Sequence, residues 1–144
     1  MENYSVRDEI IEIANKLFVY TDAQNWRALQ KEVFTPNVHF DMSSINGKNR
    51  EMSAVEICED WRKGFENIDA VNHLAGNYLV DIQNNSANVF AYATATHYKK
   101  DASKGTVREF VGTYNLHLIK TDEGWRIDAF QYNLKYAAGN INFE

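Results

Sequence analysis

The sequence predicts an α+β fold in which a curved antiparallel sheet wraps around N-terminal helices and forms a cone-shaped half-barrel. Two observations lead to this class: apolar residues before Asn67 recur with helical spacing, and those after it alternate with polar residues as in strands. Helices followed by a run of antiparallel strands are typical of the α+β class. At 144 residues the chain can bury a sizeable core, and we expect a single domain over residues 1–144.

The helical part begins with a helix expected over residues 5–20, whose apolar positions lie three and four residues apart. The next expected elements are a second helix from near Asn25 to just before Pro36, a short strand over 37–44 and a polar loop around Gly47. Ser53 and Glu56 then match a capping box, in which the hydroxyl and the carboxylate satisfy free backbone donors. They predict a third helix with an apolar inner face.

The second part of the chain consists of four long segments of alternating polarity. They cover residues 70–82, 87–99, 107–120 and 125–136. Short segments rich in Asn, Asp and Gly separate them, as is typical of hairpins. Strands of this length favour a strongly twisted and curved sheet. Helices packed across one face of such a sheet leave a cone whose mouth can hold a small ligand.

Composition and charge argue for a soluble protein without a nucleic-acid or membrane partner. The net charge is −5, and no apolar run approaches membrane-spanning length. Cys58 is the single cysteine, which excludes an intrachain disulfide and fits a reducing compartment. The first residues show no signal-peptide pattern. We therefore expect a cytoplasmic protein.

One face of the segment 87–99 is a candidate cavity wall. Ala91, Ala93 and Ala95 follow one another on this face, and His97 comes next. Small side chains leave volume that a ligand can occupy and that a histidine can line. The same alanines would equally accommodate a bulky helix packed across the sheet, so this strand alone leaves both interpretations open.

Two other strands carry polar residues that could reach the same cavity. His73 shares its face with Ala75, so the combination of small and polar residues recurs. Asn115 shares a face with Thr113. A buried amide without a partner costs about 1–3 kcal/mol, so an inward Asn115 would need a side chain, a water or a ligand. The alternative is that this face is exposed and that the other face, with Tyr114, lies inside.

Asp22 stands out because it follows the apolar run FVYT at the end of the first predicted helix. Aspartate is a good N-cap, so Asp22 could cap the helix that begins near Asn25. On a helical wheel it also lies beside Phe18, at the flank of the buried stripe. It could therefore be a carboxylate held at the edge of a pocket.

These features resemble the SnoaL-like branch of the nuclear transport factor 2-like superfamily, and within it the scytalone dehydratase type. The motifs that carry the resemblance are DAQNW after the first helix, NHLAGN, THYKKD and NLHLIKTDEGWRI, and together they span nearly the whole chain. The resemblance implies the cone fold. It also implies four catalytic residues: Asp22 as the acid, His73 as the general base, His97 as the second active-site histidine and Asn115 as the active-site asparagine.

Two departures separate the chain from the scytalone dehydratase pattern. Thr21 stands where that enzyme has a tyrosine before its aspartate. The second pocket tyrosine of that enzyme corresponds to a position near Asp41 or Met42, where this chain has no tyrosine. In that family these tyrosines hold a water on the substrate carbonyl, so their absence argues against the fungal melanin substrate. Four further side chains are expected to contact substrate: Tyr20, Thr113, Tyr132 and Trp61.

The candidate residues together predict general-base chemistry. Histidine titrates near neutral pH, and a carboxylate bound to one ring nitrogen fixes its tautomer and stabilises the imidazolium. An Asp22–His73 pair could remove a proton next to a carbonyl while Asn115 and His97 donate hydrogen bonds to the carbonyl oxygen. We therefore expect a lyase or isomerase that needs no cofactor. Its substrate would be a small apolar or ring-containing molecule that undergoes dehydration or a double-bond shift.

Two alternatives remain open at the level of the sequence. Two histidines and a carboxylate could bind a divalent metal, but no His-x-His pair supports this, and we expect no metal. The cone could also be a non-catalytic module for binding a small hydrophobic ligand or for dimerisation. The face of segment 87–99 with Phe90, Tyr92 and Tyr98 predicts a homodimer or a higher homo-oligomer.

Overall fold

The computed structural model describes residues 4–144, so the first three residues of the predicted 1–144 domain lie outside it. Its helices are α1 (Val6–Asp22), α2 (Trp26–Ala28), the π-helix η1 (Leu29–Val33), α3 (Ser43–Asn46) and α4 (Ala54–Gly64). Its strands are β1 (Phe34–Asp41), β2 (Asn49–Ser53), β3 (Ala70–Gln83), β4 (Ser86–Tyr98), β5 (Val107–Thr121) and β6 (Gly124–Gly139). No helix in this described part of the chain is both long and apolar enough to cross a membrane.

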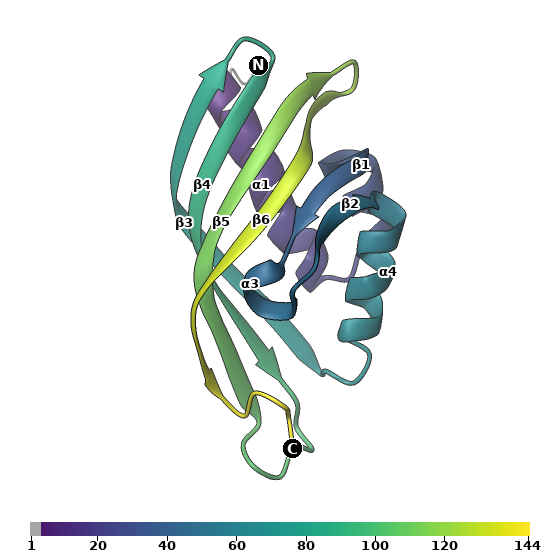
Figure 1. The fold of residues 1–144 in the computed structure, drawn as a ribbon, viewed down its shortest axis with the longest axis vertical. Coiled ribbons are helices and arrows are strands. Elements are labelled where there is room, and N and C mark those ends of the chain that lie inside the picture. Colours follow the sequence, from purple (N-terminus) through teal and green to yellow (C-terminus); the bar gives the residue numbers. More distant parts are fainter. Residues whose placement is uncertain (1–3) are drawn as a thin grey trace.

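The six strands form one curved, unclosed sheet in the order β2-β1-β6-β5-β4-β3. Neighbouring strands are antiparallel except β1 and β6, which run parallel. Figure 1 shows α1 lying across one face of the long strands and α4 beside β1 and β2. Helices gathered on one face of a mostly antiparallel sheet confirm the predicted α+β half-barrel.

Each of the two long helices begins at a serine N-cap. The Ser5 hydroxyl accepts a hydrogen bond from the backbone N–H of Asp8, and the Ser53 hydroxyl accepts one from Glu56, both at 3.1 Å. In return, the Asp8 and Glu56 carboxylates accept from the backbone N–H groups of the two serines. The capping box predicted from Ser53 and Glu56 is therefore present, and a second one fixes the start of α1.

The segment between α1 and α4 differs from the sequence prediction. The sequence predicts one helix up to Pro36, whereas the structure has the short α2, the π-helix η1 and then β1 from Phe34. Pro36 is tolerated in β1 because the pairing of β1 with β6 is interrupted between Phe34 and His39. The loop predicted around Gly47 is too long, because residues 49–53 pair with β1 as strand β2.

The register of the β4–β5 hairpin decides which side chains face the helices. Directly opposed residues on antiparallel strands share a face. Ala91 opposes Tyr114 and Ala95 opposes Phe110, so the alanine face of β4 continues across β5 as an aromatic face. Ala91 and Tyr114 are buried, whereas Asn115 is exposed. Of the two arrangements that the sequence leaves open for β5, the structure has the one with Tyr114 inside.

Gly112 allows β5 and β6 to approach closely near the centre of the sheet. A Cβ at this position would lie 2.4 Å from the backbone oxygen of Asn133 and 2.6 Å from the Tyr132 hydroxyl. Because the backbone cannot yield without disturbing the ladder, we expect Gly112→Ala to lower the free energy of unfolding by about 2 kcal/mol or more, measured by urea denaturation. Gly64→Ala is the matched control, since nothing described lies within 4 Å of its Cβ position. Equal losses in both variants would contradict this packing account.

Candidate active site

A cavity of about 420 Å³ lies between the sheet and the helices. Its walls come from α1, α4 and the inner faces of five strands. Aromatic rings make up much of the lining: Phe18, Phe40, Trp61, Phe110, Tyr114 and Phe130. His73, His97, Arg108 and Tyr132 add polar groups to these walls. The cavity has the size and the mostly apolar character of a small-molecule site.

Asp22, the last residue of α1, binds His73 of β3 at two points. Asp22 Oδ1 lies 2.6 Å from His73 Nδ1, and Asp22 Oδ2 accepts from the His73 backbone N–H at 2.8 Å. The His73 side chain is 10% exposed, and its ring stacks on Phe18 with 5.6 Å between centroids. Because a carboxylate only accepts, Nδ1 is the donor in this contact. His73 Nε2 is then the nitrogen left free for a ligand.

The contact with His73 also settles the local role of Asp22. The N-cap of α2 is Asn25, whose side-chain oxygen accepts from the backbone N–H of Ala28 at 3.1 Å. Both carboxylate oxygens of Asp22 are bound to His73 instead. The interpretation of Asp22 as a helix cap is therefore wrong.

His97 of β4 and Arg108 of β5 are directly opposed and line the same cavity. Arg108 Nε donates to His97 Nδ1 at 2.9 Å. Burial lowers the pKa of His97 to about 4, and the positive charge of Arg108 contributes to the shift. Since arginine cannot accept, the neutral ring carries its hydrogen on Nε2. His97 is therefore a hydrogen-bond donor through Nε2 at neutral pH.

Tyr132 of β6 brings a hydroxyl to the cavity that has no hydrogen-bond partner among the described residues. The residue is 3% exposed, and its ring lies 4.9 Å from that of Tyr114. Burial raises the pKa of Tyr132 to about 12, so the hydroxyl keeps its proton. An unpaired buried donor costs about 1–3 kcal/mol. This hydroxyl is therefore an unsatisfied buried group beside the cavity.

Three predicted site residues lie away from the cavity. Asn115 and Thr113 belong to the outer face of β5, and Asn115 Nδ2 donates to Gln131 Oε1 there at 3.1 Å. The Tyr20 hydroxyl donates to Glu32 Oε1 at 3.4 Å, in a contact between α1 and η1. The β5 register corrects the expected placement of Asn115 and Thr113. The expected placement of Tyr20 at the cavity is also wrong, because its position on α1 directs the hydroxyl to Glu32 instead. Trp61, by contrast, lines the cavity as expected.

The sequence prediction missed several polar residues of the cavity wall, namely Asn46, Lys48, Asp60 and Arg108, of which Arg108 is the one that contacts a predicted site residue. Its position follows from the hairpin, because Lys99 N–H donates to the Thr106 carbonyl at 2.8 Å and closes the turn between β4 and β5. Two residues further from the turn along each strand, His97 lies opposite Arg108. The hairpin turn was therefore the feature of the sequence from which the position of Arg108 could have been predicted. Alternation within a single strand does not give this pairing.

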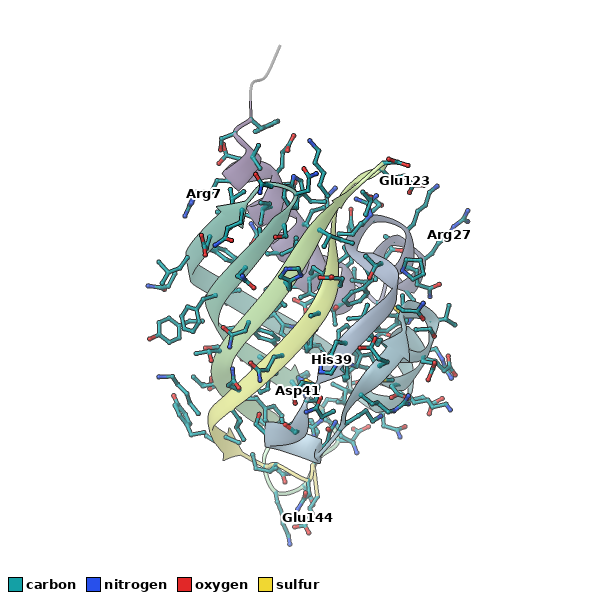
Figure 2. All side chains as sticks on the ribbon, turned by 45° about the horizontal axis from the view of Figure 1, so that its top comes forward. Arg7, Arg27, His39, Asp41, Glu123 and Glu144 are labelled. Carbon is teal, nitrogen blue, oxygen red and sulfur yellow. The ribbon has the colours of Figure 1, made fainter. Side chains whose placement is uncertain are left out.

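A second His–Asp pair lies on the outer face of the sheet. His117 Nδ1 is 2.6 Å from Asp128 Oδ1, the same separation as in the pair at the cavity. His117 borders an open groove of about 510 Å³, which His39 and Asp41 also line. Figure 2 shows His39 and Asp41 on β1, next to the long strands. The described residues thus contain two similar His–Asp pairs, of which one lies at the cavity.

Within residues 4–144, no three His, Cys, Asp or Glu side chains gather as a group that could hold a metal ion. The free thiol of Cys58 is buried on α4. Burial raises the pKa of Cys58 to about 11, so the thiol stays protonated at neutral pH. A protonated thiol is a poor nucleophile.

The fold and the cavity define a class of protein, small α+β half-barrels with an aromatic cavity that carries polar groups. Sequence comparison identifies the family within this class. A sequence model described as the SnoaL-like domain matches residues 2–131, and the chain belongs to this family. The family resemblance noted from the motifs is thereby confirmed. A search of curated proteins finds no significant match.

Similar solved structures extend over nearly the whole chain. The Kfla4162 protein from Kribbella flavida is 23% identical, has a TM-score of 0.90, and matches over 95% of each chain. A "putative aromatic ring hydroxylase" from Novosphingobium aromaticivorans is 20% identical, with a TM-score of 0.80 over 98% of this chain and 99% of that one. A "putative scytalone dehydratase" from the same organism is 13% identical, with a TM-score of 0.77 over 90% and 84%. At these identities the likeness shows the fold.

The burial of His97 makes stability depend on pH. Its pKa is about 4 in the folded protein and 6.5 for the free group, so the unfolded chain binds a proton that the folded chain excludes. This contribution is present above about pH 6.5 and is lost as the pH falls towards 4, by at most about 3 kcal/mol. Urea denaturation at pH 7 and pH 4.5 should show a smaller pH-dependent loss for His97→Gln than for the wild type. Parallel losses would contradict the buried neutral state.

Proposed function

We propose that the protein is a cofactor-independent lyase or isomerase that moves a proton next to a carbonyl group in a small ring-containing molecule. The observation that carries this proposal is the Asp22–His73 pair at the cavity wall. One carboxylate binds both the ring and the backbone of the histidine. An imidazole fixed in this way, with one free nitrogen beside an apolar cavity, meets the requirements of a general base.

The proposed reaction begins when His73 Nε2 takes the proton from the carbon next to the carbonyl. The electron pair of the broken C–H bond moves into an enolate, and Asp22 stabilises the imidazolium. In a dehydration, the enolate expels the β-hydroxyl group, which takes the proton from the imidazolium and leaves as water. In a double-bond shift, the imidazolium returns the proton to the γ carbon. Both routes restore neutral His73.

The charge that develops on the carbonyl oxygen needs donors that are already in place. His97 supplies its Nε2–H, and Arg108 supplies a positive charge beside it. Preorganised donors of this kind typically contribute about 3–4 kcal/mol each to lowering the barrier. In our proposal, the Arg108–His97 pair takes the role of carbonyl donors that the sequence analysis expected of Asn115 and His97.

The cavity restricts the substrate. A volume of about 420 Å³ with aromatic walls suits one ring or two fused rings. The buried Thr21 hydroxyl donates to the Leu17 carbonyl at 2.6 Å, so it is not a substitute for the missing pocket tyrosine. Tyr132 lines the same cavity, as expected of a residue that contacts the substrate. We therefore propose a substrate other than the fungal melanin precursor.

We also propose that the outer face of the sheet packs against a second copy of the chain. On this face Leu74 is 75% exposed, Leu79 67% and Tyr92 44%. Large apolar side chains that gather on one face are typical of association surfaces. The single cysteine fits a reducing compartment, and the cytoplasm remains the expected location.

Proton abstraction can be tested before the substrate is known. Cyclic β-hydroxy ketones and β,γ-unsaturated ketones of one and two rings are incubated with the protein in D2O, and NMR follows deuterium uptake next to the carbonyl and product formation. We expect the wild type to catalyse exchange with at least one compound. Asp22→Asn and His73→Ala should each lower the rate by about 100-fold or more, because they remove the base or its orientation.

The second His–Asp pair provides a matched control. His117→Ala removes an equally close contact from the outer face and should leave the exchange rate within about twofold of the wild type. Asn115→Ala should do the same, since Asn115 lies outside the cavity. Exchange that survives in His73→Ala would contradict the proposed base. Compounds that bind the wild type without exchange or turnover would favour the alternative, a non-catalytic module for small hydrophobic ligands.

A further inference from the structure

Residues 140–144, which we name the 140–144 turn, close against the β4–β5 hairpin. Asn140 Nδ2 donates to the backbone oxygens of Gly105 (2.9 Å) and Glu144 (2.8 Å). Asn140 Oδ1 in turn accepts from the Glu144 N–H at 3.2 Å. The Lys104 N–H donates to the Glu144 backbone oxygen at 3.0 Å. Figure 1 shows this end of the chain beside the loop that joins β4 to β5.

Phe143 anchors the turn. It is 8% exposed, although the adjoining residues of the turn are exposed. Its φ angle is 51°, a left-handed conformation that residues with side chains rarely adopt and that surrounding contacts must hold. The Arg108 guanidinium lies 4.4 Å from the centre of the Phe143 ring. The turn therefore packs on the arginine that reaches into the cavity.

The guanidinium of Arg108 bridges two partners. Its Nη1 donates to the backbone oxygen of Ile141 at 2.8 Å, and its Nε donates to His97 Nδ1 at 2.9 Å. Arginine has a long side chain with much rotational freedom, and the planar guanidinium directs its hydrogen bonds at fixed angles. Holding one nitrogen and one face of the guanidinium sets the direction of the others. The turn thus restrains the arginine that binds His97.

We propose that the 140–144 turn is a positioning element, which holds Arg108 against His97 and thereby keeps the imidazole in the tautomer that donates from Nε2. Asn140 and Phe143 are its positioning residues. The inference rests on the proposed function only where it assigns that Nε2–H to the substrate carbonyl. The restraint itself is a property of the ligand-free protein.

The restraint can be measured without turnover. In the ligand-free protein, NMR follows the titration of the His97 ring, and long-range ¹H–¹⁵N spectra report which ring nitrogen carries the hydrogen at neutral pH. The wild type should show an unprotonated Nδ1 and a low titration midpoint. Asn140→Ala and Phe143→Leu should each raise the midpoint by about half a unit or more, because the arginine charge moves away and water enters. In these variants the neutral His97 ring should populate both tautomers, with the hydrogen on Nδ1 in some molecules and on Nε2 in others.

Two further variants bracket the result. Glu144→Gln removes only the exposed Lys104–Glu144 ion pair and should leave both NMR readouts unchanged. Arg108→Gln removes the guanidinium and should reproduce or exceed the effect of the turn variants. If Asn140→Ala and Phe143→Leu both match the wild type while Arg108→Gln does not, the turn has no positioning role. If all variants match the wild type, the Arg108–His97 contact is also overturned.

The outcome is separate from that of the deuterium-exchange experiment. A restrained His97 in a protein that exchanges no substrate proton would uphold the positioning element and reject the catalytic proposal. An active enzyme with an unrestrained His97 would do the reverse.

Discussion

The two-point contact between Asp22 and His73 joins the helical layer to the sheet and depends on residues 51 positions apart in sequence. The serine cap fixes where α1 begins, and the length of the helix brings its last residue to β3. The carboxylate then binds a backbone N–H of the strand as well as the imidazole. Breaking this contact would leave a partly buried charge without its partner. The same interaction therefore fixes the end of α1 to β3 and orients the candidate base.

The two cavity histidines differ because their partners differ. His73 faces a carboxylate, which makes Nδ1 a donor and leaves Nε2 free for a ligand. His97 faces a guanidinium, which makes Nδ1 an acceptor and leaves Nε2 with the hydrogen. In the proposed mechanism one ring takes a proton and the other donates a hydrogen bond, and an acid–base site requires both roles. Of the β4 alanines, Ala95 lines the cavity beside His97.

Much of this architecture follows from the sequence. The capping box at Ser53, the hairpin turns and the alternation of β4 determine their elements locally, so they were predictable. Alternation within β5 left its two faces undecided, and only the family resemblance placed Asn115 inside. The pairing across the hairpin, which sets Ala91 opposite Tyr114, decides the question. Neither the parallel pairing of β1 with β6 nor the contact of the 140–144 turn with Arg108 leaves a local pattern. The features that the sequence prediction missed depend on strand pairing and side-chain contacts between residues far apart in the sequence.

The most direct test of the central claim is a crystal structure of the protein with a ketone that it deprotonates, or with a close unreactive analogue. The account predicts that the ligand lies in the cavity, with its carbonyl oxygen within hydrogen-bond distance of His97 and the neighbouring carbon facing His73 Nε2. A ligand bound only in the outer groove near His117 would contradict it. So would a ligand in the cavity whose carbonyl points away from both histidines.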